Sequence, residues 1–480
     1  MAILLTVLVY FSLLLVFSKL TARRPGNRAF FLANRQSPWY MVAFGMVGAS
    51  ISGVTFVSVP GMVNQIGMTY LQTCLGFVVG YAAVAFLLLP VYYRLRLTSI
   101  YTYLWHRLGR MSYKTGAGFF LLSKMTGAAV RFYVMCIILQ RFVFDAVHLP
   151  FAATVSVMVG LIWLYTYRGG IKTLVWTDSF QTLCMFAALL LIIGHVMSAL
   201  DMNVGEAVRA IADDSRSRVF VFDDWVSTQN FWKQFVSGIF IVIVMTGLDQ
   251  DMMQKNLTCK TLGGAQKDMC SYGLAFVPAN LLFLCLGVLL SILAERTGTP
   301  LPASGDELLP MFAAGGRLGD AVVVFFTIGI VAASFSSADS ALTALTTIYC
   351  VDICEREGDE RLRKRTHLMM AALFVVFILL FRAVNSTSVI DAIYILCSYT
   401  YGPLLGLFAY GLLTRRTVND RLVPYIALAS PLICFAADRL VTSATGYRFG
   451  YELLLLNGLL TFAALYLTGK RSVSTNKVID

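Results

Sequence analysis

The chain has 480 residues, of which 58% are hydrophobic and 13% are charged. Apolar runs of about 20 residues recur along it, so the composition excludes a soluble multidomain protein and predicts a polytopic membrane protein. The formal net charge of +12 does not indicate a nucleic-acid partner, because lysines and arginines gather in alternate short loops, as the positive-inside rule expects.

Motifs typical of enzymes and ATP-driven pumps are absent from the sequence. It contains no GxxxxGK[ST] loop and no HExxH motif, and its ten cysteines fall in apolar runs or in loops expected inside the cell. We therefore expect no enzymatic activity, no ATP, no cofactor and no disulfide framework. Membrane lipid is the expected surrounding.

Hydropathy predicts an all-α membrane protein with about thirteen spans. Threading them from an outside N-terminus puts most lysines and arginines in inside loops, and Lys255, Lys260 and Lys267 then follow the seventh span. This predicts a multi-pass protein of the cell membrane, with its C-terminus in the cytoplasm. The expected spans are residues 2–20, 38–66, 70–93, 115–143, 150–166, 174–200, 231–254, 271–294, 319–353, 367–385, 388–412, 422–440 and 449–469.

Two of these spans carry interruptions. Between Met46 and Gly61 the second span holds three glycines, three serines, a threonine and a proline, and the seventh span is interrupted at 246–251. Breaks in a membrane helix free backbone carbonyls, which is tolerated where they are buried or bind something, although glycines also serve close helix packing. Matching breaks in two five-span halves indicate an inverted-repeat transporter with its site near the membrane midplane.

This pattern predicts five units in the chain. We expect residues 1–37 to form an extra N-terminal span and an inside loop, and 38–200 the first repeat. Residues 201–230 should be an outside loop with a short amphipathic helix. Residues 231–412 should form the second repeat, and 413–480 two C-terminal spans and an inside tail.

The ninth span contains an unusual density of hydroxyl groups. Ala333, Ser336 and Ser337 stand at i, i+3 and i+4, so one carbonyl and two hydroxyls share one side of a helix. Oxygen ligands without softer neighbours suit a small hard cation. Asp339 adds a carboxyl group at membrane depth, where ionisable residues indicate function. Membrane serines also bond to the preceding turn and pack helices together, which is the structural alternative.

Four segments, in this order and spacing, resemble the sodium/solute symporter family, which includes sodium-coupled sugar, proline, sialate and iodide carriers. The resemblance implies a LeuT-type fold with two inverted five-helix repeats. It covers roughly residues 35–415, and the segments are Gly48-Ala-Ser-Ile-Ser-Gly53, Gly169-Gly-Ile-Lys-Thr-Leu-Val-Trp-Thr-Asp-Ser-Phe-Gln181, Gly247-Leu-Asp-Gln-Asp-Met-Met-Gln254 and Ala332-Ala-Ser-Phe-Ser-Ser-Ala-Asp-Ser340.

The family resemblance implies cation sites. Sodium would bind the carbonyls of the first core helix at its break and a carbonyl and two hydroxyls of the eighth, which here are Gly48, Ile51, Ala333, Ser336 and Ser337. A second cation site, used by some members, would fall on Asp178, Asp339 and Ser340. Asp178 also suits a helix N-terminal cap, and Asp339 is equally compatible with a proton carrier or a structural group.

The resemblance also implies solute contacts on five core helices. Lys124 and Arg131 are seven residues apart and share one face, which fits an anionic solute such as a sialate or another carboxylate, and a sugar-like solute stays among the expected substrates. Either residue is equally able to snorkel or to pair with an aspartate. The implied contacts are Ser52, Thr55, Gln72, Lys124, Arg131, Asp249, Gln250 and Tyr399. Asp249 and Asp251 replace the Asn and Tyr of sugar carriers, and Ser50 replaces an Asp of proline carriers.

The leading hypothesis is sodium-driven uptake of a small polar or anionic solute by alternating access, with sodium as the coupling ion. The sequence is also compatible with two alternatives to a sodium-coupled carrier. A solute sensor on a transporter scaffold would bind without net flux, and a proton-coupled carrier would use Asp178 or Asp339.

Overall fold

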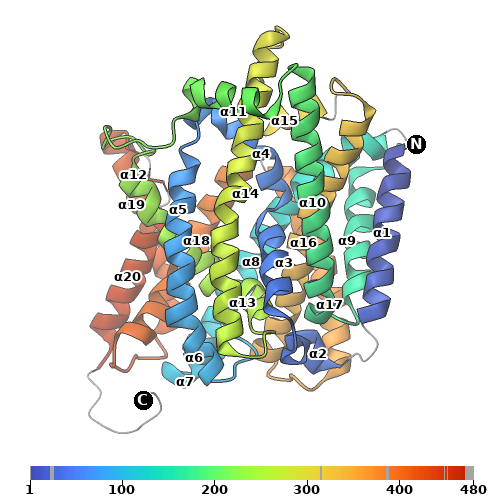
Figure 1. Cartoon of the computed structure of the whole chain (residues 1–480). Coiled ribbons are helices and arrows are strands. Elements are labelled where there is room, and N and C mark those ends of the chain that lie inside the picture. The colour runs from blue at the N-terminus through green and yellow to red at the C-terminus, as the bar shows by residue number, and fades with distance from the viewer. Residues whose placement is uncertain are drawn as a thin grey trace.

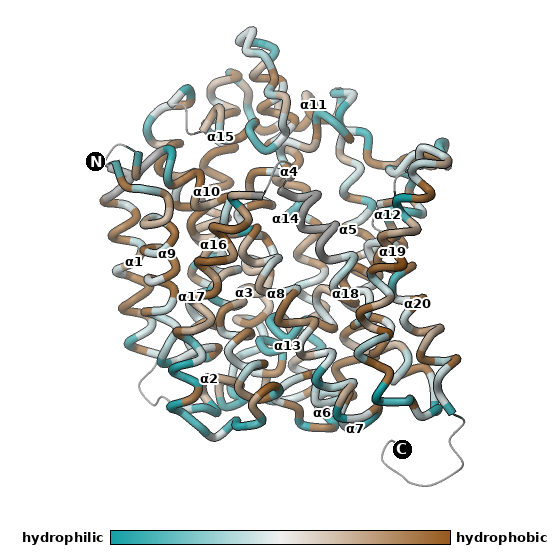
Figure 2. Tube along the Cα trace, turned by 180° about the vertical axis from the view of Figure 1, so that it is seen from behind, coloured by the Kyte–Doolittle hydropathy of each residue, from teal (hydrophilic) through white to brown (hydrophobic). Residues whose placement is uncertain are grey.

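The computed structural model describes residues 2–21, 26–145, 148–313, 316–384, 389–447, 449–450 and 452–470. In this part of the chain, long helices run side by side through one bundle (Figure 1). Hydrophobic residues cover the middle of the bundle and hydrophilic residues gather at its two ends (Figure 2). This distribution is typical of a membrane protein, because the hydrocarbon core solvates only apolar side chains.

The helices follow the predicted spans closely. Their bounds are α1 (Ala2–Thr21), α2 (Asn27–Leu32), α3 (Trp39–Ser50), α4 (Gly53–Ile66), α5 (Tyr70–Ala83), α6 (Leu89–Arg94), α7 (Thr102–Arg107), α8 (Arg110–Leu139), α9 (Phe151–Thr166), α10 (Ile171–Ala199), α11 (Val204–Asp213), α12 (Phe231–Val242), α13 (Gln250–Asn256), α14 (Leu262–Arg296), α15 (Leu308–Ala313), α16 (Asp320–Ile348), α17 (Glu360–Val384), α18 (Val389–Leu413), α19 (Val423–Thr445) and α20 (Glu452–Thr468). Short 3₁₀ and π segments connect or extend them at 33–35, 84–88, 140–144, 215–217, 243–247, 305–307 and 349–353.

Seven described helices are long and apolar enough to cross a membrane, or up to nine if each of two bent pairs counts as one span. Shorter apolar helices occupy 5–21, 151–166 and 452–468. The chain is therefore a multi-pass membrane protein. The count of about thirteen spans remains a prediction.

Both predicted interruptions are confirmed as breaks. Helices α3 and α4 are bent by 60° relative to each other, and the helical stretch 231–247 is bent by 71° relative to α13. Ile51 leaves helical geometry with ψ of 85°, and Asp249 is extended with ψ of 118°. At these residues the chain changes direction inside the bundle, so its carbonyls cannot all be satisfied by the helix itself.

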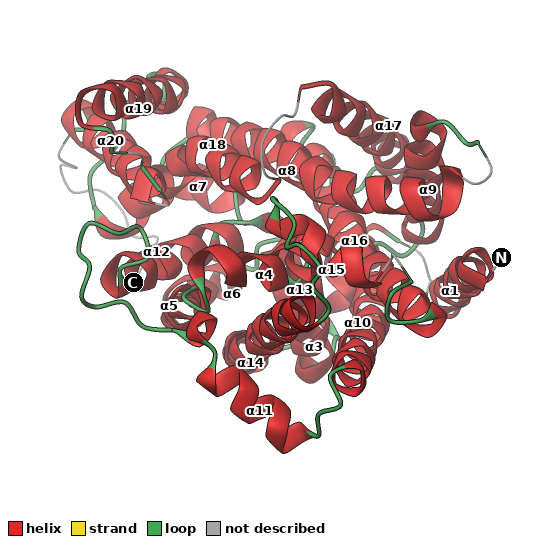
Figure 3. Cartoon of the chain, turned by 90° about the horizontal axis from the view of Figure 1, so that it is seen from above, coloured by secondary structure: helices red, strands yellow, loops and turns green. Residues whose placement is uncertain are grey.

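Parts of both broken spans, α4 and α13, lie at the centre of the bundle (Figure 3). Seen from above, α3, α4 and α13 are surrounded by α5, α8, α10, α14 and α16, while α1, α19 and α20 lie at the periphery (Figure 3). Helix α10 packs against both α16 and α3, and α5 packs against α12. The predicted amphipathic helix of the 201–230 segment is α11, which lies across one end of the bundle and buries Ala207 (Figure 1).

Helices α5 and α12 approach each other closely at two glycines. A Cβ added to Gly76 would collide with the carbonyl oxygen of Phe235, and one added to Gly238 would collide with that of Thr73. Small residues at such crossings let two membrane helices pack backbone against backbone. This contact joins the second helix of the bundle core to the first half of the broken seventh span.

We predict that Gly76→Ala lowers the free energy of unfolding by about 1–3 kcal/mol, because the methyl group meets a backbone carbonyl that cannot rotate away. The matched control is Gly118→Ala on α8, where nothing lies within 4 Å of the added Cβ and alanine favours the helix. Thermal unfolding of the purified protein in detergent measures both. Equal unfolding temperatures for the two variants would contradict this reading of the α5–α12 contact.

Candidate functional site

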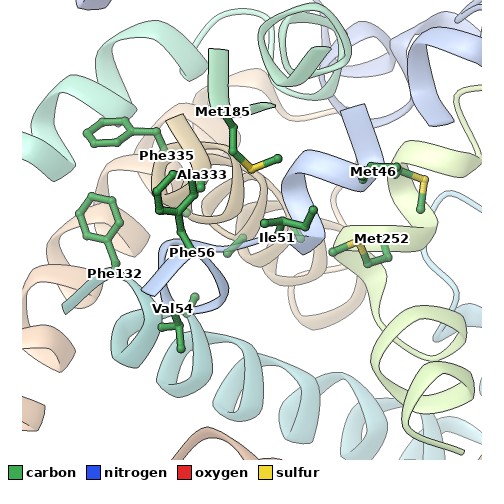
Figure 4. Packing of buried hydrophobic residues seen from close by; sticks show 14 of the residues in the cluster. Met46, Ile51, Val54, Phe56, Phe132, Met185, Met252, Ala333 and Phe335 are labelled. Carbon is green, nitrogen blue, oxygen red and sulfur yellow. The ribbon is translucent and has the colours of Figure 1, made fainter. Parts of the chain in front are cut away.

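The break between α3 and α4 lies between α10 and α16 and contacts both. A Cβ added to Gly48 would collide with Thr182 of α10, and one added to Gly53 would collide with the hydroxyl of Ser334 of α16. Figure 4 shows buried side chains around this break, among them Ile51 and Ala333. The two segments predicted to hold sodium are therefore in contact, and the glycines are what allows their helices to come so close.

All five predicted sodium ligands lie inside the protein. Gly48 is buried, Ile51 and Ser336 are fully buried, and Ala333 and Ser337 are 1% and 8% exposed. The Ser336 hydroxyl donates to Asp178 Oδ1 at 2.8 Å, whereas the Ser337 hydroxyl forms no hydrogen bond with any described residue. The chemistry of this set, carbonyl and hydroxyl oxygens in a buried break, fits a small hard cation.

The three residues of the predicted second cation site also lie together, but with a lysine among them. Lys255 Nζ lies 2.8 Å from Asp178 Oδ2, and both side chains are almost completely buried. Asp339 accepts hydrogen bonds from Tyr165 at 2.6 Å and from Ser340 at 3.2 Å. We call these residues, with Ser336, the Asp178 cluster.

The placement of Lys255 in an inside loop is wrong. Helix α13 extends to Asn256, and Lys255 is 2% exposed. Its aspartate partner on α10 compensates the cost of burying the ammonium group, which hydropathy alone cannot anticipate. The sequence feature that could have indicated a buried Lys255 is its i, i+4 spacing from Asp251, directly after a helix break.

Lys124 of α8 lies in a second buried charge cluster. Its Nζ is 3.1 Å from Asp249 Oδ2 and 2.6 Å from Asp251 Oδ2, and Tyr401 donates to Asp249 at 2.6 Å. Asp249 also caps α13 by accepting from the backbone N–H of Asp251 at 2.8 Å. Two carboxylates thus face one ammonium at the broken seventh span, so Lys124 is already neutralised by protein groups.

A cavity of about 120 Å³ lies beside the break of the second span. Three predicted solute contacts, Ser52, Thr55 and Arg131, line it. The rest of its wall combines hydroxyl groups with a majority of apolar and aromatic side chains: Ser50, Val54, Val59, Tyr70, Phe77, Tyr81, Ile241, Val242, Met245, Thr246, Met252, Tyr272 and Phe276. A much smaller pocket beside it is lined by Arg131, Lys124, Asp249 and Tyr401.

Three other predicted solute contacts lie away from this cavity. Gln72 bonds to the backbone of Gln229 and Val221, and Gln250 bonds to that of Thr98 and Ile100. The ring of Tyr399 lies against Phe435 of α19. Tyr401, which sequence reasoning missed, is the tyrosine of α18 that reaches the charge cluster, because residues two apart point to different sides of a helix.

At the end of the bundle that carries α2, α6 and α7, hydrogen bonds gather around the second break. Tyr101 donates to the carbonyl of Leu248 at 2.7 Å, and Tyr92 donates to that of Gly247 at 2.9 Å. Gln254 donates to the carbonyl of Phe31 at 2.8 Å. These bonds satisfy the carbonyls freed by the break and tie α13 to its neighbours at this end.

Comparison with known proteins identifies the family from the sequence and the fold from the structure. A family model described as the sodium:solute symporter family matches residues 30–421. The sodium/sialic acid symporter NanT of Aliivibrio fischeri is 25% identical over 446 residues, which cover 88% of this chain and 83% of that protein. The human sodium/iodide cotransporter is 28% identical over 245 residues, half of this chain and 37% of that protein. Sodium-coupled monocarboxylate transporter 2 of Danio rerio is 26% identical over 417 residues, 81% of this chain and 63% of that protein.

Two solved structures share the fold. The outward-open, substrate-bound structure of a sodium-coupled sialic acid symporter matches with a TM-score of 0.82 at 17% identity and covers 98% of this chain. Mhp1, a nucleobase-cation-symport-1 family transporter solved in a closed conformation with bromovinylhydantoin, matches with a TM-score of 0.58 at 13% identity over 93% of the chain. The predicted class, a sodium-coupled transporter and not an enzyme, is confirmed by the family model and these relatives.

We predict that Lys124→Met lowers the free energy of unfolding by about 3–5 kcal/mol, because it leaves the Asp249 and Asp251 carboxylates buried without a cation. The matched control is Lys364→Met, which removes an exposed pair with Glu360 and should cost about 0.5 kcal/mol or less. Thermal unfolding in detergent compares the two. A Lys124→Met protein as stable as Lys364→Met would show that the cluster does not hold the broken span.

Proposed function

This chain belongs to the sodium:solute symporter family, and we propose that it couples the entry of sodium to the uptake of a small organic anion by alternating access. Sodium enters from the side that holds the N-terminus and α11, and the C-terminus lies in the cytoplasm. Residues 38–200 and 231–412 act as the two inverted repeats. Each sodium ion that moves down a potential of 100 mV contributes about 2.3 kcal/mol to uptake.

The proposal that sodium binds here rests on the position of the first break, which lies between α10 and α16. It brings the free carbonyls near Gly48 and Ile51 to the helix with the Ala333, Ser336 and Ser337 oxygens. An ion held there joins two helices that belong to different repeats. Sodium therefore favours the conformation in which these helices are together, since a ligand shifts an equilibrium only through its higher affinity for one state.

Arg131 is the residue that favours an anionic solute. It lines the cavity, and within the described parts of the chain it forms no ion pair, whereas Lys124 is held by Asp249 and Asp251. A guanidinium group beside a cavity is suited to bidentate recognition of a carboxylate. Iodide, sialic acid and monocarboxylates, which give relatives of this chain their names, are anions as well.

The cavity wall further narrows the solute class. Aromatic and methionine side chains such as Phe77, Phe276 and Met245 supply an apolar surface, while Ser52 and Thr55 supply hydroxyls near the break. Such a wall suits a carboxylate with a partly apolar body, and the cationic Arg131 beside it favours an anion over a neutral solute. The anion, rather than a neutral sugar, is therefore the preferred substrate.

We predict that Ser337→Ala raises the sodium concentration needed for half-maximal stabilisation at least tenfold, because it removes one ligand from the ion. Thermal unfolding of the purified protein at increasing sodium, with choline as the balancing cation, measures this without a solute. The matched control is Thr327→Val, which removes a hydroxyl from the same helix that bonds only to Val323 of the preceding turn. Unchanged sodium dependence in Ser337→Ala would remove this site assignment.

We predict that Arg131→Met abolishes stabilisation by anionic probes in the presence of sodium, whereas Arg131→Lys retains part of it. A charge-assisted hydrogen bond contributes about 1.5–3 kcal/mol, so affinity should fall at least tenfold. Sialate, lactate and iodide serve as the anionic probes and glucose as the neutral one. Arg209→Met, which removes an exposed arginine of α11, is the control.

Uptake into proteoliposomes of the probe that binds best then separates the alternatives. Sodium-dependent accumulation supports the symporter. Binding without flux would instead indicate a sensor, and accumulation that survives replacement of sodium by choline at fixed pH would indicate proton coupling through Asp178 or Asp339. Stabilisation by glucose alone would overturn the anion assignment.

A further inference from the structure

The ammonium group of Lys255 fills the place where a second cation was predicted. Lys255 extends from α13, the second half of the broken seventh span, to Asp178 on α10, with Nζ 2.8 Å from Oδ2. The lysine and aspartate side chains are 2% and 1% exposed. Asp339 lies close enough to interact electrostatically with both residues. A monovalent cation that belongs to the protein itself therefore sits among these carboxyl groups.

The remaining oxygens of the Asp178 cluster are also engaged. Asp178 Oδ1 accepts from Ser336 at 2.8 Å, Asp339 Oδ2 accepts from Tyr165 at 2.6 Å, and Asp339 Oδ1 accepts from Ser340 at 3.2 Å. Each of the four carboxyl oxygens thus has a partner on the protein. An additional ion would have to displace a hydroxyl or the ammonium group, and buried polar groups lose affinity when their partners are displaced.

Charge repulsion argues against a second ion in the same place. Two monovalent cations about 4 Å apart repel strongly at the effective dielectric constant of a protein interior, which weakens binding on the order of a thousandfold. The predicted ion site at the α3–α4 break shares one residue with this cluster, because Ser336 donates to Asp178 Oδ1 while Lys255 pairs with Oδ2. Its other predicted ligands, Gly48, Ile51, Ala333 and Ser337, are not part of the cluster.

We infer that Lys255 acts as a tethered cation that replaces a second sodium ion at Asp178, so that the chain binds a single sodium ion per transport cycle. This inference rests on the proposed function. It makes Lys255 a residue that sets ion stoichiometry and not one that contacts the solute. Asp178 belongs to α10 in the first repeat and Lys255 to α13 in the second, so their ion pair joins the two repeats. A bound sodium ion would otherwise make this connection.

Equilibrium binding of radioactive ²²Na⁺ to the purified protein tests the inference directly, since it counts ions without a solute. The wild-type protein should saturate at one ion per chain. Lys255→Met removes the ammonium group, keeps the Asp178 carboxyl group and should raise saturation to two ions. Lys255→Arg keeps the positive charge and should stay at one.

The double variant Lys255→Met with Asp178→Asn removes the cation and its acceptor together and should also bind one ion. This double variant leaves neither charge of the pair behind, so it controls for a folding defect caused by the unpaired Asp178 in Lys255→Met. Thermal unfolding shows which preparations are folded. Two ions bound by the wild-type protein, or one ion bound by folded Lys255→Met, would overturn the inference. Sodium binding that is absent from the wild-type protein would instead overturn the proposed function together with this inference.

Discussion

The arrangement of the helices in the core depends on how the carboxyl groups buried there are paired. The aspartates beside the two breaks, Asp178, Asp249, Asp251 and Asp339, are at most 3% exposed. An unpaired carboxylate in such surroundings would cost several kcal/mol, so each must be paired, hydrogen-bonded or neutral. Lysines on α8 and α13 and tyrosines on α9 and α18 provide the partners. These contacts fix the positions of the helices that surround the two breaks.

Helix α13 connects the two charge clusters. Its N-terminal Asp249 and Asp251 face Lys124 of α8, while Lys255, one turn further along, faces Asp178 of α10. A movement of this short helix would therefore change both clusters together, and with them the wall of the solute cavity, to which Met252 contributes. Because of the break, α12 and α13 are separate segments of one span, and each contacts different neighbours. A continuous helix would not allow the two segments to move separately.

The cavity and the predicted sodium ligands share the first break. Ser52 lines the cavity, and its neighbour Ile51 belongs to the predicted ion site. Under the proposed function, an ion that orders the break would also order the cavity wall, and this would couple ion binding to solute binding. At the end of the bundle that carries α2, α6 and α7, hydrogen bonds from Tyr92, Tyr101 and Gln254 join neighbouring elements.

The sequence by itself determined the all-helical membrane class, both breaks and the oxygen-lined face of α16. These features are local, because hydropathy, glycine and proline content and the i, i+3, i+4 spacing act within a single span. Only the tertiary structure decided that Lys124 is neutralised by Asp249 and Asp251, that Lys255 is buried beside Asp178, and that Tyr401 rather than Tyr399 reaches the charges. These partners come from helices far apart in the chain, and which side chains meet depends on the rotation and packing of each helix against its neighbours. Spacing within one helix carries no information about that.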